Sequence, residues 1–126
     1  MNFFRILSVI LSFMTLNCSA NAQNKTSIED FEAKTKNQKV QLIDVRTPAE
    51  FAVGHLKNAK NINYSSDTFS EEMSKLDKNK AVYIYCAAGG RSGKAVTILE
   101  KIGFKQIFDL EGGFNAWKKA GKDTDK

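Results

Sequence analysis

The sequence is poor in the residues that disulfides and metal sites require. It contains two cysteines and one histidine, His55, in 126 residues. Cys18 lies in an apolar N-terminal segment, so the rest of the chain keeps Cys86 alone and no internal disulfide is expected. One cysteine and one histidine are too few ligands for a zinc site, and no cofactor is expected. The G-x-S-x-G turn of a Ser-His-Asp hydrolase is also missing.

The chain is equally short of proline and of charge gathered in one place. A single proline and a hydrophobic fraction of 42% fit a packed globular core, and the length gives room for one domain of ordinary size. The net charge of +5 comes from lysines spread along the chain, with acidic residues between them. Since no basic run is interleaved with aromatic residues, nucleic-acid binding is not expected. A monomer is expected by default.

Long apolar runs are absent except near the N-terminus. Arg5 supplies a positive charge, residues 6–16 are almost wholly apolar, and Ala20-Asn21-Ala22 has the A-x-A arrangement of a cleavage site. The pattern predicts a signal peptide over residues 1–22 and a periplasmic or secreted domain over residues 23–126. An uncleaved anchor is disfavoured because the apolar stretch would rise only about 16 Å as a helix, short of the ~30 Å bilayer core.

Lipid attachment at Cys18 is a third alternative. A cysteine after an apolar stretch can be a lipoprotein acceptor, although Thr15-Leu16-Asn17 before it match the usual preceding residues poorly. Cleavage and lipid attachment differ in where the protein resides, and both leave Cys86 as the cysteine available for chemistry. A lone cysteine in an oxidising compartment is either buried inertly or kept reactive.

The remainder of the chain alternates between strand-like and helix-like segments. Short runs of branched apolar residues predict strands, and apolar residues at helical spacing predict helices. The predicted strands are residues 40–45, 62–64, 81–85 and 106–110, and the predicted helices are residues 26–33, 49–51, 69–76, 92–102 and 114–120, between a polar tether at 23–25 and a polar tail. Because no tight hairpin turn joins neighbouring strands, the pattern predicts an α/β fold with a central parallel sheet flanked by helices on both faces.

A glycine-rich loop, Cys86-Ala87-Ala88-Gly89-Gly90-Arg91-Ser92, follows the strongest predicted strand directly. Ligands of parallel α/β sheets bind at the carboxyl ends of strands. Gly89 and Gly90 can take positive φ values and turn backbone N–H groups toward the sulfur, and a helix that begins near Ser92 adds partial positive charge. Such a loop binds anions and predicts a lowered pKa for the Cys86 thiol.

Two roles are open for Arg91. Its guanidinium can fork to a bound anion or hold the loop through the loop's own carbonyl oxygens, and the sequence does not distinguish them. The alternative for Cys86 is that it is a small buried hydrophobe. The glycine pair, the arginine and the helix that follow it disfavour that interpretation.

The loop resembles the active-site loop C-x-x-G-x-R-S of the rhodanese-like sulfurtransferases. Other segments are similar to further motifs of that family, namely Leu42-Ile43-Asp44-Val45-Arg46 with Glu50-Phe51, Gly54-His55-Leu56 with Ala59 and Asn61-Ile62, and Leu110-Glu111-Gly112-Gly113 with Trp117. The resemblance extends over nearly all of the chain after the apolar segment. A signal peptide before one such domain resembles the single-domain, secreted or periplasmic type.

The resemblance implies a thiosulfate sulfurtransferase that works through a Cys86 persulfide. The thiolate would take sulfane sulfur from thiosulfate or a persulfide donor and pass it to a thiol or cyanide acceptor, or to a partner protein. Catalysis would rest on Cys86. Substrate binding would fall to Ala87, Ala88, Gly89, Gly90 and Arg91, and structural support of the site to Asp44, Arg46 and Ser92, with Asp44 and Arg46 as an ion pair.

Two details of the loop bear on the choice of chemistry. Four residues separate Cys86 from Arg91, one fewer than in the related phosphatases, so phosphatase-like or arsenate-reductase-like activity is disfavoured. Ala87 and Ala88 stand where family members often carry a charged or polar side chain that holds thiosulfate. The alternative function is therefore a non-catalytic sulfur carrier or protein-interaction module.

Four residues outside the loop receive structural or solvent-exposed roles. His55 is expected to fix the turn around it through a hydrogen bond. Trp117 and Phe114 have helical spacing and are expected in the core. Lys94 is expected to be solvated on the helix that follows the loop, although its charge lies near the predicted pocket.

Overall fold

The computed structural model describes residues 24–37 and 39–126, and the predicted signal peptide with Cys18 lies outside them. Within these residues a five-stranded sheet has the order β1-β6-β5-β2-β4, with every neighbouring pair parallel. Its strands are β1 (Lys25–Thr26), β2 (Gln41–Asp44), β4 (Lys60–Asn61), β5 (Val82–Tyr85) and β6 (Ile107–Leu110). The helices are α2 (Ile28–Thr35), α3 (Pro48–Val53), α4 (Phe69–Ser74), α5 (Gly90–Ile102) and α6 (Gly113–Lys119).

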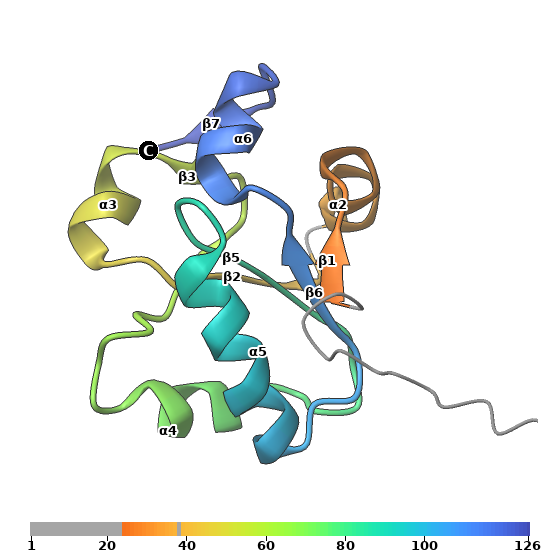
Figure 1. Cartoon of the computed structure of the whole chain (residues 1–126), viewed down its shortest axis with the longest axis vertical. Helices are drawn as coiled ribbons and strands as arrows, with labels where there is room; N and C mark the ends of the chain where they lie inside the picture. Colours follow the sequence, from red (N-terminus) through yellow and green to blue (C-terminus); the bar gives the residue numbers. More distant parts are fainter. Residues whose placement is uncertain (1–23, 38) are drawn as a thin grey trace, which may run out of the picture.

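Helices cover both faces of the sheet, which confirms the predicted architecture. In Figure 1, α5 lies in front of the sheet, while α2 lies beside the β1 edge. The α4–α5 face buries Ile43, Val45, Met73, Ile84, Val96 and Leu99, and the α2–α6 face buries Phe31, Leu42, Tyr83, Tyr85, Leu110 and Trp117. Since successive strand residues alternate between faces, the Cys86 side chain follows Ile84 onto the α5 face.

Two short pairings join residues that are far apart in the sequence. Lys25–Thr26 pairs with β6 as strand β1, and β7 (Thr124–Asp125) pairs antiparallel with β3 (His55–Leu56). The polar tether predicted at residues 23–25 is therefore strand at Lys25, and the predicted polar tail is strand at Thr124–Asp125. Two-residue strands leave no periodic pattern to detect, so local sequence could not reveal them.

The strand predicted at residues 62–64 is also wrong, because β4 ends at Asn61. The backbone nevertheless continues beside the end of β2. The Ile62 N–H donates to the Asp44 carbonyl at 3.0 Å, and the Tyr64 N–H donates to the Val45 carbonyl at 2.9 Å. The apolar side chains of this segment thus reach the core without regular strand geometry.

A buried ion pair closes the end of β2. The Arg46 guanidinium donates through Nη2 to Asp44 Oδ2 at 2.7 Å, and both residues are buried. It also donates to the Gly54 carbonyl at 2.6 Å and lies over the Phe114 ring at 4.2 Å. The predicted ion pair is therefore present, and it connects β2, the end of α3 and α6.

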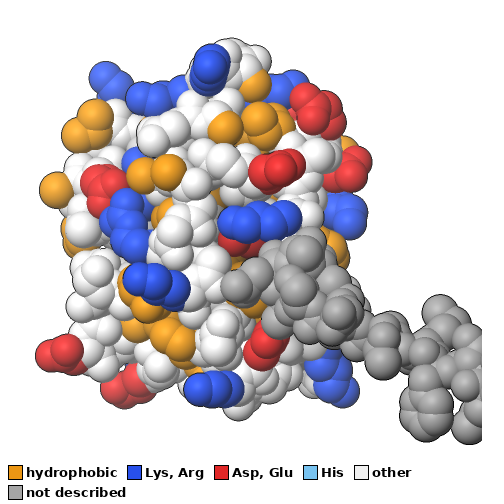
Figure 2. All heavy atoms as spheres, viewed as in Figure 1, with side chains coloured by type: hydrophobic (Ala, Val, Ile, Leu, Met, Phe, Trp, Pro, Cys, Tyr) orange, Lys and Arg blue, Asp and Glu red, His pale blue; other side chains and the backbone are white. Residues whose placement is uncertain are grey.

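Charge is dispersed over the face of the molecule shown in Figure 2, where Lys and Arg side chains alternate with Asp and Glu. This distribution matches the interleaved charges of the sequence. Among the helices that the structure describes, none has the length and apolar character needed to cross a bilayer.

Replacement of Arg46 by alanine should strongly destabilise the fold, because it leaves the Asp44 carboxylate buried without its partner. We expect a loss of about 3–5 kcal/mol in the free energy of unfolding, measured by urea denaturation. Lys122→Ala is the matched control, since the Lys122–Glu32 pair is partly exposed and should contribute at most about 1 kcal/mol. Equal losses in the two variants would contradict this assignment.

Candidate active site

Cys86 begins the loop that joins β5 to α5. β5 ends at Tyr85 and α5 begins at Gly90, so the loop lies at the carboxyl end of a central parallel strand (Figure 1). The Cys86 residue is only 1% exposed. The position matches the one predicted from the sequence.

Hydrogen-bond donors surround the Cys86 sulfur. The Gly89 N–H donates to Sγ at 3.0 Å, and the fully buried Ser92 hydroxyl lies 3.3 Å from Sγ. Burial by itself raises the pKa of the Cys86 thiol, but hydrogen bonds from Ser92 and from the backbone at Gly89 and Ala88 outweigh it, so the pKa is lowered. The loop therefore favours the thiolate, as its sequence predicts.

Only one glycine of the Gly89–Gly90 pair turns the chain. Gly89 has φ of 108°, a left-handed conformation that suits glycine, whereas Gly90 is the first residue of α5. Gly90, for which the sequence also allowed a positive φ, does not take one, and the helix begins two residues before Ser92. One left-handed residue is enough to aim the Gly89 amide at the sulfur, so the first turn of α5 can start at once and bring its N-terminus closer.

Backbone N–H groups at the start of α6 donate hydrogen bonds to carbonyl groups of the loop. The Phe114 N–H donates to the Cys86 carbonyl at 2.8 Å, and the Asn115 N–H donates to the Ala87 carbonyl at 3.0 Å. Gly113 makes this approach possible because a Cβ there would lie 2.5 Å from the Cys86 carbonyl oxygen. These bonds lie on the α6 face, whereas the sulfur points to the α5 face.

Arg91 fixes the loop to α3. Its guanidinium makes two hydrogen bonds to the Glu50 carboxylate, Nη1 to Oε1 at 2.7 Å and Nη2 to Oε2 at 2.9 Å, a bidentate geometry that is strong for its type. Glu50 also closes a capping box with Thr47. The loop is thus held through a side-chain carboxylate, a partner that the two sequence-based roles for Arg91 did not include.

The Arg91 pairing lowers the pKa of Glu50 to about 2. A carboxylate with a depressed pKa stabilises the folded protein at pH values above its ordinary value of 4.5. That contribution is lost as the pH falls through about 2. The link between the loop and α3 therefore persists well into mildly acidic conditions.

A pocket of about 450 Å³ opens beside the loop at Ala87. Its lining includes Phe114 and Lys118 of α6, Glu50 and Val53 of α3, and Thr124 and Lys126 of the C-terminal segment. Lys118 and Lys126 are exposed, and neither belongs to an ion pair among the described residues. The pocket therefore combines uncompensated positive charge with the exposed apolar side chain of Val53.

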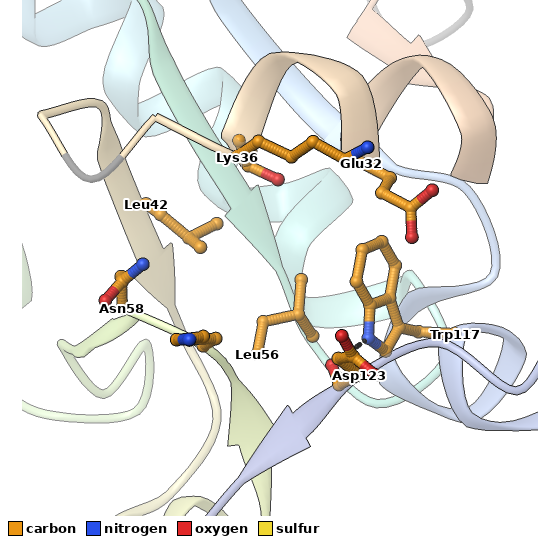
Figure 3. Close-up of a pocket in the computed structure, with 9 residues that line it drawn as sticks. Glu32, Lys36, Leu42, Leu56, Asn58, Trp117 and Asp123 are labelled. Carbon is orange, nitrogen blue, oxygen red and sulfur yellow. Dashed lines mark hydrogen bonds between the residues drawn. The ribbon is translucent and has the colours of Figure 1, made fainter.

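A second cavity of about 250 Å³ lies between α2, the ends of β2 and β3, and α6. Figure 3 shows Trp117, Leu42 and Leu56 around it, with Lys36 and Glu32 from α2. The Trp117 Nε1–H donates to the Asp123 carbonyl at 2.8 Å. None of the predicted site residues lines this cavity, so it is not the candidate active site.

The residues assigned roles outside the loop lie where the sequence predicted. His55 Nδ1 is 2.9 Å from the Phe51 carbonyl, and the two rings stack with centroids 3.7 Å apart, which fixes the turn. Trp117 and Phe114 are buried in the α2–α6 cluster, and Lys94 is exposed. In residues 24–37 and 39–126, no three His, Cys, Asp or Glu side chains are placed to hold a metal ion.

Three residues near the loop received no role from the sequence. Glu50 pairs with Arg91, and Lys25 pairs with Asp109 close to Gly89. The T-x-x-E spacing from Thr47 to Glu50 signals a helix N-terminus, but it does not reveal the second partner of the carboxylate. For Lys25 and Asp109 no local signal exists, because 83 residues separate them.

Replacement of Gly113 by alanine should disturb both the fold and the loop. We expect a loss of about 2–5 kcal/mol in the free energy of unfolding, from left-handed backbone strain and from the clash with the loop carbonyls. Gly121→Ala is the matched control, because Gly121 also has positive φ but nothing lies within 4 Å of the added Cβ. It should lose only about 1–2 kcal/mol, and a loss as large as that of Gly113→Ala, measured by urea denaturation, would refute the close approach.

Comparisons with known proteins agree with the geometry. The family model described as the rhodanese-like domain matches residues 27–120. The chain is 41% identical over 93 residues to the uncharacterized protein YqhL of Bacillus subtilis, covering 74% of this chain and 71% of YqhL. It is 36% identical over 92 residues to the chloroplastic thiosulfate sulfurtransferase 16 of Arabidopsis thaliana, covering 65% of this chain and 77% of that protein.

The fold is also shared with solved structures. A rhodanese-related protein from Thermoplasma volcanium superposes with a TM-score of 0.72 at 30% identity, covering 81% of this chain and 97% of that chain. Some curated relatives are much longer. The chain spans 21% of the probable adenylyltransferase/sulfurtransferase MoeZ of Mycobacterium tuberculosis, with 37% identity over 82 residues that cover 65% of this chain.

Proposed function

Since this chain belongs to the rhodanese-like family, and relatives of it are named sulfurtransferases, we propose that it transfers sulfane sulfur through a persulfide on Cys86. One observation carries the proposal. The Cys86 sulfur is buried at the end of β5 and accepts a hydrogen bond from the Gly89 amide, with Ser92 beside it. Such a site stabilises a sulfur anion and positions it for nucleophilic attack.

The proposed cycle has two displacement steps. The Cys86 thiolate attacks the outer sulfur of thiosulfate, a new S–S bond forms, the old S–S bond breaks, and sulfite leaves with its electron pair. An acceptor thiolate then attacks the outer sulfur of the persulfide, which returns Cys86 to the thiolate and leaves the persulfide on the acceptor. With cyanide as the acceptor, the product is thiocyanate. The loop amides stabilise the anionic sulfur in both steps.

The pocket beside Ala87 suits the entry of a small anion such as thiosulfate. Lys118 and Lys126 place positive charge at its rim, where family members often use a charged residue within the loop itself. Long-range attraction by such lysines raises the local concentration of anions. Arg91 is proposed to contribute charge near the sulfur while it remains bonded to Glu50.

The acceptor is proposed to be external. Cys86 is the free cysteine of the described residues, so the domain holds no second thiol that could resolve the persulfide. The proposed setting is the periplasm or the cell exterior, after cleavage of the predicted signal peptide, with lipid attachment at Cys18 as the alternative. The protein is proposed to act as a monomer.

Incubation of the purified protein with thiosulfate should add about 32 Da to Cys86, the mass of one sulfur atom. Intact-mass spectrometry before and after treatment with a thiol measures both formation and discharge of the adduct. The Cys86→Ser variant should gain nothing. An unmodified wild-type protein after exposure to both thiosulfate and a polysulfide would refute the proposal.

Replacement of Lys118 by glutamine should raise the KM for thiosulfate about 3- to 10-fold, since a charge in the entry pocket is lost, while kcat changes little. Steady-state thiocyanate formation from cyanide measures both constants. Lys119→Gln is the matched control, because Lys119 belongs to the same helix but does not line the pocket. Equal KM values in the two variants would exclude this entry route.

Slow turnover of every small donor, together with a stable protein complex, would instead favour the carrier role.

A further inference from the structure

A buried carboxylate lies on the same face of the sheet as Cys86. Asp109 pairs with Ile84 in the β5–β6 register and is 1% exposed. Its neighbour two residues back, Ile107, packs in the α4–α5 cluster with Cys86, so strand alternation points the Asp109 side chain toward α5. Among the described residues, Asp109 Oδ1 has no hydrogen-bond partner. A buried polar atom without a partner is costly to keep, which calls for a functional explanation.

The other oxygen of this carboxylate binds Lys25. Lys25 Nζ donates to Asp109 Oδ2 at 3.1 Å, across the β1–β6 register that pairs the two residues. The same Nζ lies 3.2 Å from the position that a Cβ on Gly89 would take. One ammonium group therefore binds a buried carboxylate and lies close to the residue whose amide donates to the Cys86 sulfur.

Ser92 lies between the sulfur and the carboxylate. Its hydroxyl oxygen is 3.3 Å from Cys86 Sγ and 3.3 Å from the Gly89 carbonyl oxygen. Burial raises the pKa of Asp109, and the neighbouring Ser92 hydroxyl and Lys25 ammonium offset this only in part. Ser92 thus acts on both groups, since it lowers the pKa of the Cys86 thiol and that of the Asp109 carboxyl.

We propose that Lys25 and Asp109 are positioning residues of the Cys86 loop. The Lys25 ammonium balances the negative charge of the Asp109 carboxylate. It also supports Gly89, so that the Gly89 amide stays directed at the sulfur. This inference rests on the proposed function in one respect, that Cys86 is the reacting group. It adds a strand outside the loop, β1, to the machinery of the site. Neither residue needs to touch the sulfur donor.

Two other ion pairs lie near the Cys86 loop. Arg91 of α5 binds Glu50 of α3, and Arg46 binds Asp44 at the end of β2. The Lys25–Asp109 pair completes the set on the β6 side. Removal of one member of this pair therefore leaves a single unbalanced charge near the sulfur, and its sign depends on which member is removed.

Lys25→Gln should raise the pKa of the Cys86 thiol, because it leaves the Asp109 charge uncompensated next to the thiolate. Asp109→Asn should lower it, because the nearby negative charge is lost. We expect shifts of about half to one pH unit in opposite directions, with the double variant close to wild type. The measurement is a titration of thiolate ultraviolet absorbance in the full chain, with the spectrum of the matching Cys86→Ser protein subtracted.

Lys122→Gln is the matched control, since it removes a lysine of similar exposure from its ion pair with Glu32, away from the loop, and should leave the titration unchanged. Lys25→Arg keeps the cation and should restore the wild-type midpoint. Shifts of the same sign in the two single variants, or no shift beyond that of Lys122→Gln, would overturn the proposal. If Asp109→Asn does not fold, the difference in titration midpoint between Lys25→Gln and Lys25→Arg tests the proposal.

The titration also separates this inference from the proposed function, because thiolate absorbance requires no sulfur transfer. Opposite shifts in a protein that forms no persulfide would uphold the positioning pair and reject the sulfurtransferase. If the protein forms a persulfide but neither substitution moves the titration midpoint of Cys86, the sulfurtransferase is upheld and the positioning pair is rejected.

Discussion

The loop can hold an anion only if the carbonyl oxygens of Cys86 and Ala87 point away from the sulfur and accept hydrogen bonds elsewhere. Phe114 and Asn115 meet this requirement, since their amides donate to the two carbonyls from the first turn of α6. Carbonyl dipoles that pointed at a thiolate would repel it, whereas amide dipoles attract it. Gly113 allows the two backbones to approach. This contact fixes the direction of the two loop carbonyls.

Three ion pairs from different elements then hold the surroundings of the loop. One joins α5 to α3, one closes the end of β2 beneath α6, and one links β1 to β6: Arg91–Glu50, Arg46–Asp44 and Lys25–Asp109. The Arg46–Asp44 pair and the Asp109 carboxylate are buried, and a buried ion pair contributes more to a unique geometry than to net stability. The site is therefore supported by fixed charges on several sides and does not rely on the loop alone.

The features that local sequence predicts well are those with a local cause. The strand before Cys86, the helix that follows the glycines and the donors on the sulfur all arise within a few consecutive residues, and all are present. Gly90 shows a limit of this reasoning, because composition cannot say which of two glycines takes the left-handed conformation. Glu50 shows another, since a capping residue gives no sign of a second partner 41 residues away.

Non-local pairing explains what could not be predicted. β1 and β7 are two residues long, and only their partners in β6 and β3 give them strand geometry. The Lys25–Asp109 pair depends on the β1–β6 register, which the polar residues near the start of the domain do not disclose. The parts of the site that come from β1 and β7 thus form only when these segments pair with β6 and β3.

The pairing of β7 with β3 has a practical consequence for handling the protein. It holds Thr124 at the pocket beside Ala87, with Lys126 at the same rim. Any peptide fused after Lys126 would emerge at the rim of that pocket. A purification tag at that position would alter the charge around the pocket, so a cleavable tag, removed before assay, is the safer design.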